Sequence, residues 1–180
     1  MQLHLVNGFL GSGKTTAIIA LTRNYLQLGK KVAIVMGSQS DSPIAEKAEE
    51  IFKEFSIPYE TFVISAHRNP NRIHKFCKSA SEKGFGVIIG IAGLAAHLPG
   101  VIASLTVLPV IGVPGSGGPL NGVDALHSIV QMPAGIPVAC VGIGNSKNAA
   151  LLAVQILATG EPALFDALKE YRKSFGDDES

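Results

Sequence analysis

Short apolar runs alternate with amphipathic stretches along the chain. Each apolar run ends in glycine, serine or proline, and the stretch that follows carries apolar residues at helical spacing. This alternation is typical of parallel strands that are covered by helices, so it predicts an α/β fold. The predicted strands are 3–6, 32–36, 61–64, 87–91, 107–113 and 138–143. The predicted helices are 14–28, 43–55, 70–83, 95–104, 124–130, 145–159 and 161–175.

The composition favours one compact domain and argues against a nucleic-acid partner or a membrane span. Of the 180 residues, 47% are hydrophobic and 16% are charged, which provides enough apolar surface for a buried core. The formal net charge is +1 and the basic residues form no long run, so no nucleic-acid partner is expected. The apolar runs are shorter than the roughly 20 residues that cross a bilayer, so we expect no membrane span.

The amino terminus and the cysteines indicate in which cellular compartment to expect the protein. The sequence begins Met1-Gln2-Leu3-His4, without the basic and apolar regions of a secretory signal. Cys77 and Cys140 are too few for a disulfide framework and lack the CxxC spacing of zinc and redox sites. We therefore expect two free thiols, no metal site and a cytoplasmic protein.

A phosphate-binding motif follows the first predicted strand. The segment GFLGSGKT matches GxxxxGK[ST] and resembles the opening of CobW-type nucleotide-binding metallochaperones. In this motif the glycines let backbone N–H groups surround a phosphate, the lysine reaches the terminal phosphates, and the hydroxyl binds magnesium. The residues concerned are Gly8, Gly11, Gly13, Lys14 and Thr15.

Other parts of a nucleotide-hydrolysing site are missing from the later sequence. No later predicted strand ends in an aspartate suited to magnesium, and no Asn-Lys-x-Asp motif reads a guanine base. Two interpretations stay open for residues 1–30. They form either a module that binds GTP or ATP with magnesium, or an appended strand, loop and helix without hydrolysis.

Polar residues follow three later strands. Ser38, Ser40 and Asp41 come after strand 32–36, where hydroxyls and helix amides can bind phosphate and a carboxylate can bind ribose. The alternative is that Ser40, Asp41 or Ser42 only caps a helix. The segment SAHR at 65–68 pairs an imidazole that titrates near neutrality with an anion-binding guanidinium. His97 follows the next strand. Ligands of open parallel sheets bind at this carboxyl edge.

Four segments keep one order along the chain. They are VAIVMGSQSDS at 32–42, SAHR at 65–68, AAHLPG at 95–100 and SIVQMPAGIPV at 128–138. Together they resemble the PurE family, N5-carboxyaminoimidazole ribonucleotide mutases of purine (IMP) biosynthesis. The resemblance implies a flavodoxin-like three-layer sandwich, a homo-octamer, and an isomerase that acts on a small ribonucleotide without a cofactor.

The resemblance also implies roles for individual residues. His67 and His97 would be catalytic: in the similar enzymes the substrate loses its N-carboxylate as carbon dioxide, and a histidine handles the proton on the imidazole carbon that is then carboxylated. An enclosed pocket would retain the carbon dioxide. The implied substrate-binding residues are Ser38, Ser40, Asp41, Ser65, Ala66, Arg68, Gly93 and Ala95.

Ile91 and Leu94 depart from the family's usual pattern, because they occupy places where glycine permits close backbone approach. Three functions therefore stay open: the mutase, which the SAHR motif favours, a carboxylase that uses free carbon dioxide, and a relative that binds ligand without turnover. The glycine-rich segment 115–118 is predicted to be a flexible loop.

The two resemblances divide the chain into an extension, 1–30, and a catalytic domain, 31–180. In a sheet of order 2-1-3-4-5, strand 32–36 would be flanked by strands 61–64 and 87–91. Strand 3–6 could then not pair with strand 32–36. The junction is compatible with a fusion, a chimera or a misjoined reading frame.

Overall fold

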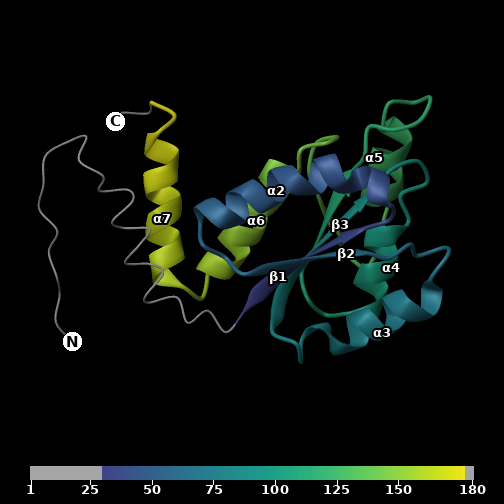
Figure 1. Cartoon of the computed structure of the whole chain (residues 1–180), viewed down its shortest axis with the longest axis horizontal. Coiled ribbons are helices and arrows are strands. Elements are labelled where there is room, and N and C mark those ends of the chain that lie inside the picture. Colours follow the sequence, from purple (N-terminus) through teal and green to yellow (C-terminus); the bar gives the residue numbers. More distant parts are fainter. Residues whose placement is uncertain (1–29, 177–180) are drawn as a thin grey trace, which may run out of the picture.

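A parallel sheet forms the centre of the computed structural model, which describes residues 30–176 (Figure 1). The predicted strand 3–6 and helix 14–28 lie outside the described residues. The sheet is five-stranded, with the order β2-β1-β3-β4-β5 that the sequence predicts. Its strands are β1 (Lys31–Met36), β2 (Tyr59–Val63), β3 (Phe85–Ala92), β4 (Val110–Pro114) and β5 (Ala139–Cys140).

Strand β1 is paired along both edges. Ile34 lies opposite Thr61 of β2 on one side and opposite Ile89 of β3 on the other. Both ladders of β1 are therefore occupied, as the predicted strand order requires. No edge of β1 is free to accept another strand.

Proline marks the beginning of several helices. Pro43, Pro70, Pro99 and Pro162 occupy the first or second position of α2, α3, α4 and α7, where the missing N–H costs no helical hydrogen bond. The helical elements are the 3-10 turn η1 (Gln39–Asp41), α2 (Ser42–Glu54), α3 (Pro70–Ala80), α4 (Leu98–Leu105), α5 (Val123–Val130), α6 (Ser146–Ala158) and α7 (Pro162–Lys173).

Alternating side chains of the strands build two separate cores. Ile34 of β1 belongs to a core shared with α2, α6 and α7, whereas Val35 belongs to a core shared with α3, α4 and α5. The helices therefore cover both faces of the sheet, which gives the predicted three-layer sandwich (Figure 1).

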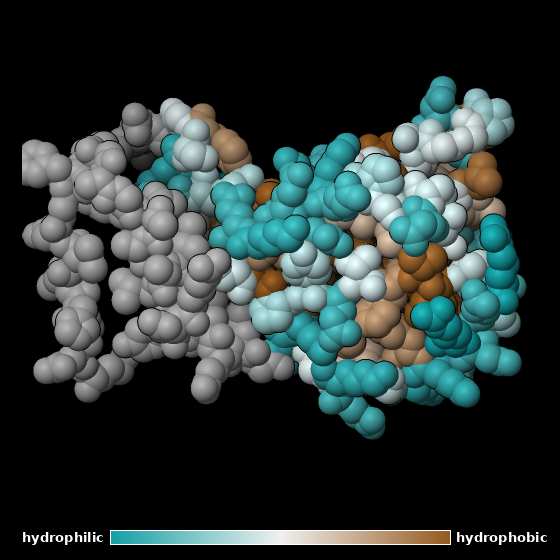
Figure 2. Space-filling model, in the orientation of Figure 1, coloured by the Kyte–Doolittle hydropathy of each residue, from teal (hydrophilic) through white to brown (hydrophobic). Residues whose placement is uncertain are grey.

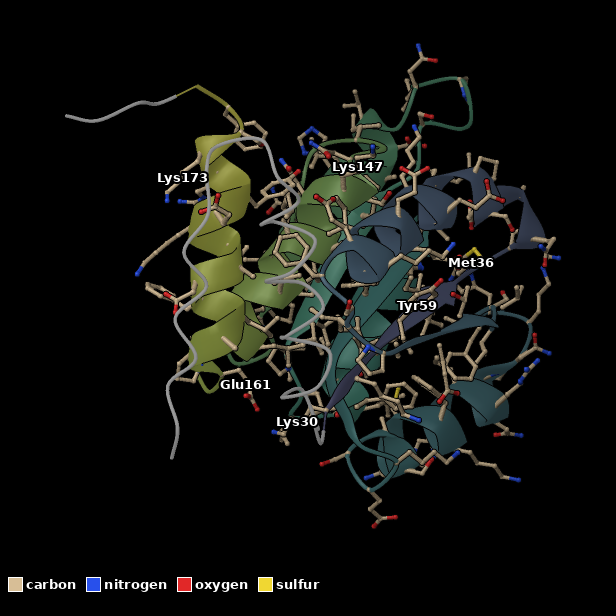
Figure 3. The ribbon with its side chains drawn as sticks, turned by 60° about the vertical axis from the view of Figure 1, so that its left-hand side comes forward. Lys30, Met36, Tyr59, Lys147, Glu161 and Lys173 are labelled. Atoms are coloured by element: carbon tan, nitrogen blue, oxygen red, sulfur yellow. The ribbon has the colours of Figure 1, made fainter. Side chains whose placement is uncertain are left out.

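Helix α7 extends the first of these helical layers. It stands beside α6 in Figure 3, where Glu161 and Lys173 label its two ends. Its Tyr171 ring packs on Phe55 at the end of α2, with ring centroids 5.4 Å apart. The face in Figure 2 is mainly hydrophilic over the helices, with smaller apolar patches between them. Within residues 30–176, no helix is long and apolar enough to cross a bilayer.

Two predicted strands are too long. The run 107–113 is apolar throughout, but Val107 is fully exposed and the strand begins at Val110. The predicted strand 138–143 pairs with β4 over only Ala139–Cys140, because the chain then turns toward α6. Apolar sequence continues through both connections, so hydrophobicity alone misplaces these boundaries.

The predicted helix 95–104 begins later than expected. Leu94 and Ala96 have φ angles of 55° and 37°, which lie in the left-handed region and interrupt a right-handed helix. Helix α4 therefore starts at Leu98, and His97 occupies its N-cap position without a side-chain hydrogen bond to the helix. Within residues 30–176, the other helix predictions agree with the structure to within a few residues at each end.

Candidate active site

The predicted site residues of the described chain gather at one edge of the sheet. Ser38 and Asp41 follow β1, His67 follows β2, and His97 follows β3. These strands are neighbours in the order β2-β1-β3 and are parallel, so their carboxyl ends lie together. Residues that are distant in the sequence thus meet where an open α/β sheet binds its ligands.

Two histidines are in direct contact at this edge. His67 Nε2 lies 2.9 Å from His97 Nδ1, and the rings meet edge to face at an interplanar angle of 81°. Both side chains are exposed. One nitrogen must donate and the other accept, so the contact holds a single proton; a second proton would turn two N–H groups toward each other. The pair can therefore accept a proton from a ligand or donate one to it.

A tight turn presents His97. The Ala96 amide donates to the Gly93 carbonyl at 3.0 Å, and Leu94 and Ala96 inside this turn both have positive φ. Ala96 is buried, whereas Leu94 and Ala95 are exposed. Each left-handed residue other than glycine costs on the order of 1–2 kcal/mol. The turn ends at His97, whose imidazole contacts that of His67.

The segment after β1 forms a capped helix start. The Ser38 hydroxyl accepts from the Ser40 amide at 3.3 Å, and the Asp41 carboxylate accepts from the Ser38 amide at 3.1 Å. The Ser40 hydroxyl lies 3.0 Å from the Ser38 hydroxyl. Of the predicted capping residues, Asp41 takes part in a capping box, whereas the N-cap of η1 is Ser38, which is not among them. Asp41 also precedes α2 but makes no side-chain cap bond there. The hydrogen bonds among these residues hold two hydroxyls and one carboxylate at the sheet edge.

Burial dominates the electrostatics of Asp41. Desolvation raises the pKa of its carboxyl above the ordinary value, and the hydrogen bond from the Ser38 N–H partly lowers it. A hydrogen-bond donor from a ligand would stabilise the charged form of this group. The carboxylate is thus suited to bind neutral hydroxyls.

The segment after β2 begins helix α3. The Ser65 hydroxyl accepts from the Arg68 amide at 3.2 Å, and the Ser65 carbonyl accepts from the Asn69 amide at 2.9 Å. Ser65 and Ala66 are partly buried, and Arg68 is exposed. Within residues 30–176, no carboxylate forms an ion pair with the Arg68 guanidinium. This guanidinium is free to bind an anion.

A further loop reaches the same edge, and the sequence indicated only its flexibility. The Gly115 amide donates to the Ala92 carbonyl at 2.9 Å, next to the predicted site residue Gly93. A Cβ atom at Gly115 would lie only 3.3 Å from the Gly93 Cα atom. The glycine at 115 is the signal that could have revealed this close approach.

The predicted phosphate-binding residues cannot be placed beside this site. They lie outside the described residues, as does the whole amino-terminal motif. The residues concerned are Gly8, Gly11, Gly13, Lys14 and Thr15. Within residues 30–176, no group of three or more His, Cys, Asp or Glu side chains could hold a metal ion.

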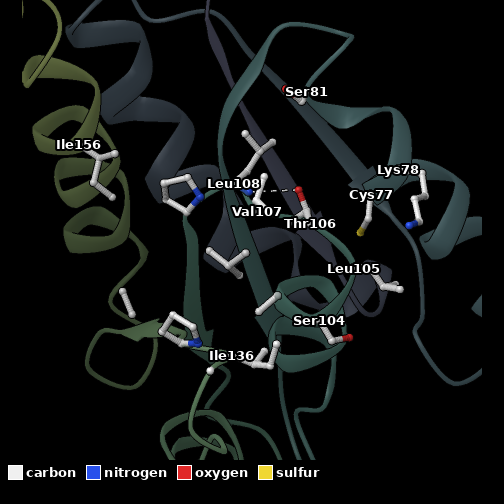
Figure 4. A pocket seen from close by; sticks show the side chains of 16 residues that line it. Cys77, Lys78, Ser81, Ser104, Leu105, Thr106, Val107, Leu108, Ile136 and Ile156 are labelled. Atoms are coloured by element: carbon white, nitrogen blue, oxygen red, sulfur yellow. Dashed lines mark hydrogen bonds between the residues drawn. The ribbon is translucent and has the colours of Figure 1, made fainter.

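A cavity of about 800 Å³ lies at the other end of the sheet (Figure 4). Its lining includes Cys77 of α3, Thr106 and Val107 before β4, and Ile136 before β5. None of the predicted site residues lines it. Burial raises the pKa of the Cys77 thiol to about 11, which leaves it protonated and unreactive at neutral pH. This cavity carries no group prepared for acid, base or nucleophilic chemistry.

Two sequence models of protein families match the chain. The model of AIR carboxylase matches residues 31–178. The model of the CobW/HypB/UreG nucleotide-binding domain matches residues 2–56. The second match thus runs beyond the amino-terminal segment into β1 and α2, which belong to the parallel sheet described above.

Several named proteins resemble most of the chain. The N5-carboxyaminoimidazole ribonucleotide mutase of Pyrococcus horikoshii is 58% identical over 142 residues, covering 79% of this chain and 80% of that protein. The mutase of Thermotoga maritima is 53% identical over 143 residues, with 79% and 84% covered. The phosphoribosylaminoimidazole carboxylase of Schizosaccharomyces pombe is 53% identical over 140 residues, which are 78% of this chain and 25% of that protein.

The fold agrees with a solved structure. The crystal structure of Treponema denticola PurE superposes with a TM-score of 0.74 and 32% sequence identity, covering 81% of this chain and 90% of that one. The predicted flavodoxin-like sandwich and the resemblance to PurE are therefore confirmed for the part of the chain that the structure describes. The chain belongs to the AIR carboxylase family.

Proposed function

We propose that this chain is an isomerase of purine biosynthesis that converts N5-carboxyaminoimidazole ribonucleotide to 4-carboxy-5-aminoimidazole ribonucleotide. The observation that carries the proposal is the contact between His67 and His97 at the carboxyl edge of the sheet. The P. horikoshii and T. maritima relatives named above bear the name of this activity. The exposed imidazole pair supplies the proton chemistry that the reaction needs.

The polar groups around this pair suit a ribonucleotide. We assign the phosphate to the Arg68 guanidinium and to the hydroxyls of Ser38 and Ser40, and the ribose hydroxyls to the Asp41 carboxylate. The free guanidinium and the desolvated carboxylate support these assignments. Ser65, which fixes the turn before α3, and Ala66 would shape the floor of the site. Gly93 and Ala95 would line the side that holds the carboxylate.

The reaction needs one proton to move from carbon to nitrogen. The bond between the exocyclic nitrogen and the carboxylate breaks, carbon dioxide is released within the site, and the nitrogen takes up a proton. The ring carbon then forms a bond to the carbon dioxide and loses its own proton. His67 donates the first proton and accepts the second, so the enzyme returns to its starting state. His97 shares the proton through its 2.9 Å contact. This scheme uses neither a metal ion nor GTP or ATP.

A second candidate is direct carboxylation of aminoimidazole ribonucleotide by free carbon dioxide. The similarity to the S. pombe carboxylase favours it, although this chain spans 25% of that protein. The site would bind the same ribonucleotide in both cases. The two reactions differ in whether carbon dioxide enters from solution.

A third candidate concerns the amino-terminal motif alone. The match to the CobW/HypB/UreG domain favours binding of GTP or ATP with magnesium by Lys14 and Thr15. In our proposal residues 1–30 are an appended segment and 31–180 form the catalytic domain. We also expect a cytoplasmic homo-octamer, which light scattering would test.

The deciding experiment is an assay of the purified full chain. N5-carboxyaminoimidazole ribonucleotide is supplied with and without GTP and magnesium, and aminoimidazole ribonucleotide is supplied with bicarbonate in a parallel arm. We expect turnover of the first substrate that does not depend on nucleotide. Turnover only of the second substrate would establish the carboxylase instead. Absence of turnover together with bound nucleotide would assign the function to the amino-terminal motif.

A further inference from the structure

We propose that Leu94 is a positioning residue that holds the loop 115–122 beside the histidine pair and thereby sets the affinity for substrate. This inference rests on the proposed function. Leu94 lies between Gly93 and Ala95, in the turn that presents His97, but it has no role in the chemistry above. Three observations, on the backbone, the side chain and the opposing loop, lead to this assignment.

The backbone of Leu94 is strained. Its φ angle of 55° is in the left-handed region, which a leucine adopts at a cost and a glycine adopts freely. Such strain persists where the surrounding structure or a functional requirement compensates for it. A leucine at this position therefore implies that its side chain makes a contact that compensates for the strain.

The side chain of Leu94 makes that contact across the site edge. Leu94 is 55% exposed, yet its Cδ2 atom lies against the backbone of Gly118: a Cβ atom built at Gly118 would be only 2.4 Å away. Gly118 itself has a φ of +85°. Any side chain at position 118 would displace Leu94, so the leucine and the glycine are complementary.

The loop 115–122 depends on this contact. Its ends are buried: Gly115 is bonded to Ala92, and Gly122 packs so closely on the Gly115 carbonyl that a Cβ atom there would lie 2.6 Å from it. Residues 116–121 between these ends are exposed, and Gly117 has no neighbour within 4 Å of a built Cβ. Leu94 thus supports the exposed middle of the loop.

The geometry connects the loop to the substrate site. Strand β4 precedes the loop and lies beside β3, which precedes the Gly93 turn, so both connections emerge at the same edge of the sheet. The loop projects beyond α5 in Figure 1. When Leu94 holds the loop against the turn, the two segments form one wall next to His97. Without that contact, the loop would have to be ordered each time substrate binds.

The test compares Leu94→Ala with Leu120→Ala. Leu120 is a matched control because it is a leucine in the loop 115–122 itself, and its exposed fraction of 58% is close to the 55% of Leu94. We expect Leu94→Ala to raise KM about tenfold with kcat changed less than threefold, and to speed amide hydrogen exchange over 115–122 about tenfold. Leu120→Ala should change neither quantity. Unchanged KM and unchanged exchange in Leu94→Ala would overturn the proposal.

A second variant separates positioning from stability. Leu94→Gly removes the side chain and relieves the strained φ, so its melting temperature should equal or exceed that of the wild type while KM still rises. If KM instead rises only in variants whose melting temperature falls, Leu94 has only a structural role. If the wild type lacks mutase activity, the proposed function fails, and the hydrogen-exchange comparison alone then decides whether Leu94 holds the loop.

Discussion

The two ends of the parallel sheet differ in chemistry more than in shape. The carboxyl edge carries two exposed imidazoles in contact, a capped serine segment and residues with strained φ angles. The amino edge carries a cavity of about 800 Å³ whose walls are mostly apolar and whose buried thiol, Cys77, is protonated at neutral pH. The size of a cavity is therefore not the reason for choosing the candidate active site of this molecule. We choose the carboxyl edge because the titratable and anion-binding groups lie there.

Removing the imidazole of His67 tests the carboxyl edge most directly. We expect His67→Asn to lower mutase turnover by roughly 10²- to 10⁴-fold, because proton transfer by a positioned side chain contributes about this much. His67 is exposed, so the free energy of unfolding should change by no more than about 0.5 kcal/mol. A turnover assay and urea denaturation measure the two effects. Retained turnover would remove His67 from the mechanism.

Truncating a buried side chain in the centre of the sheet should have the opposite effect: it should lower the free energy of unfolding. Ile89 of β3 is fully buried between β1 and β4. Ile89→Ala should lower the free energy of unfolding by about 2–5 kcal/mol, because it leaves a cavity in a packed core. Ile89→Val is the matched control, with an expected loss of about 0.5–1.5 kcal/mol. Urea denaturation compares the two, and equal losses would contradict the packing argument.

Because of the Cys77 thiol at the amino edge, the free energy of unfolding should depend on pH in the alkaline range. Burial raises the pKa of Cys77 in the folded protein from 9.0 to about 11. The contribution of Cys77 to the free energy of unfolding is therefore complete below pH 9 and is lost as the pH rises through about 11. Between these two pH values the thiol ionises in the unfolded chain but not in the folded protein. The loss is at most about 3 kcal/mol for this thiol.

Comparison with Cys77→Ala isolates this contribution. The difference in unfolding free energy between the wild type and this variant should shrink between pH 8 and pH 11, as measured by urea denaturation. A difference that stays constant over this range would show that Cys77 does not titrate as described. Cys140, whose pKa burial also raises, is only partly buried, so Cys140→Ala is the appropriate control.

A polar substitution at the rim of the amino-edge cavity should have the smallest effect. Val107 lines this cavity and is fully exposed. Val107→Asp should leave kcat and KM unchanged and alter the free energy of unfolding by less than about 0.5 kcal/mol. A clear loss of turnover in this variant would mean that the amino edge takes part in the reaction after all.

The strand order could be predicted, whereas some boundaries could not. Polar motifs after each apolar run, together with the family resemblance, indicate which ends of the strands meet and in what order. The run that begins at Val107 is apolar, but its first residues lie in an exposed connection. Sequence hydrophobicity does not distinguish an exposed valine from a buried one, because burial is decided by the packing of distant segments.

The members of the candidate site could also be predicted, but not their contacts. The predicted helix from residue 95 follows the helical preference of two alanines, and the structure overrides it with left-handed residues at 94 and 96. Pro99 in the first turn of α4 is the signal that favours the later start. Neither the contact between His67 and His97 nor that between Leu94 and Gly118 has a sequence signal, since each joins separate strand ends.

The contact between helices α2 and α6 has a consequence for synthesis on the ribosome. The Ser146 hydroxyl at the start of α6 donates to the Ile44 carbonyl of α2, and 102 residues separate the two positions along the chain. Translation at about 5–20 residues per second delivers α6 roughly 5–20 s after α2. During that interval the apolar side chains of β1 and α2 that will pack against α6 stay exposed. The nascent chain therefore needs protection from aggregation for most of its elongation.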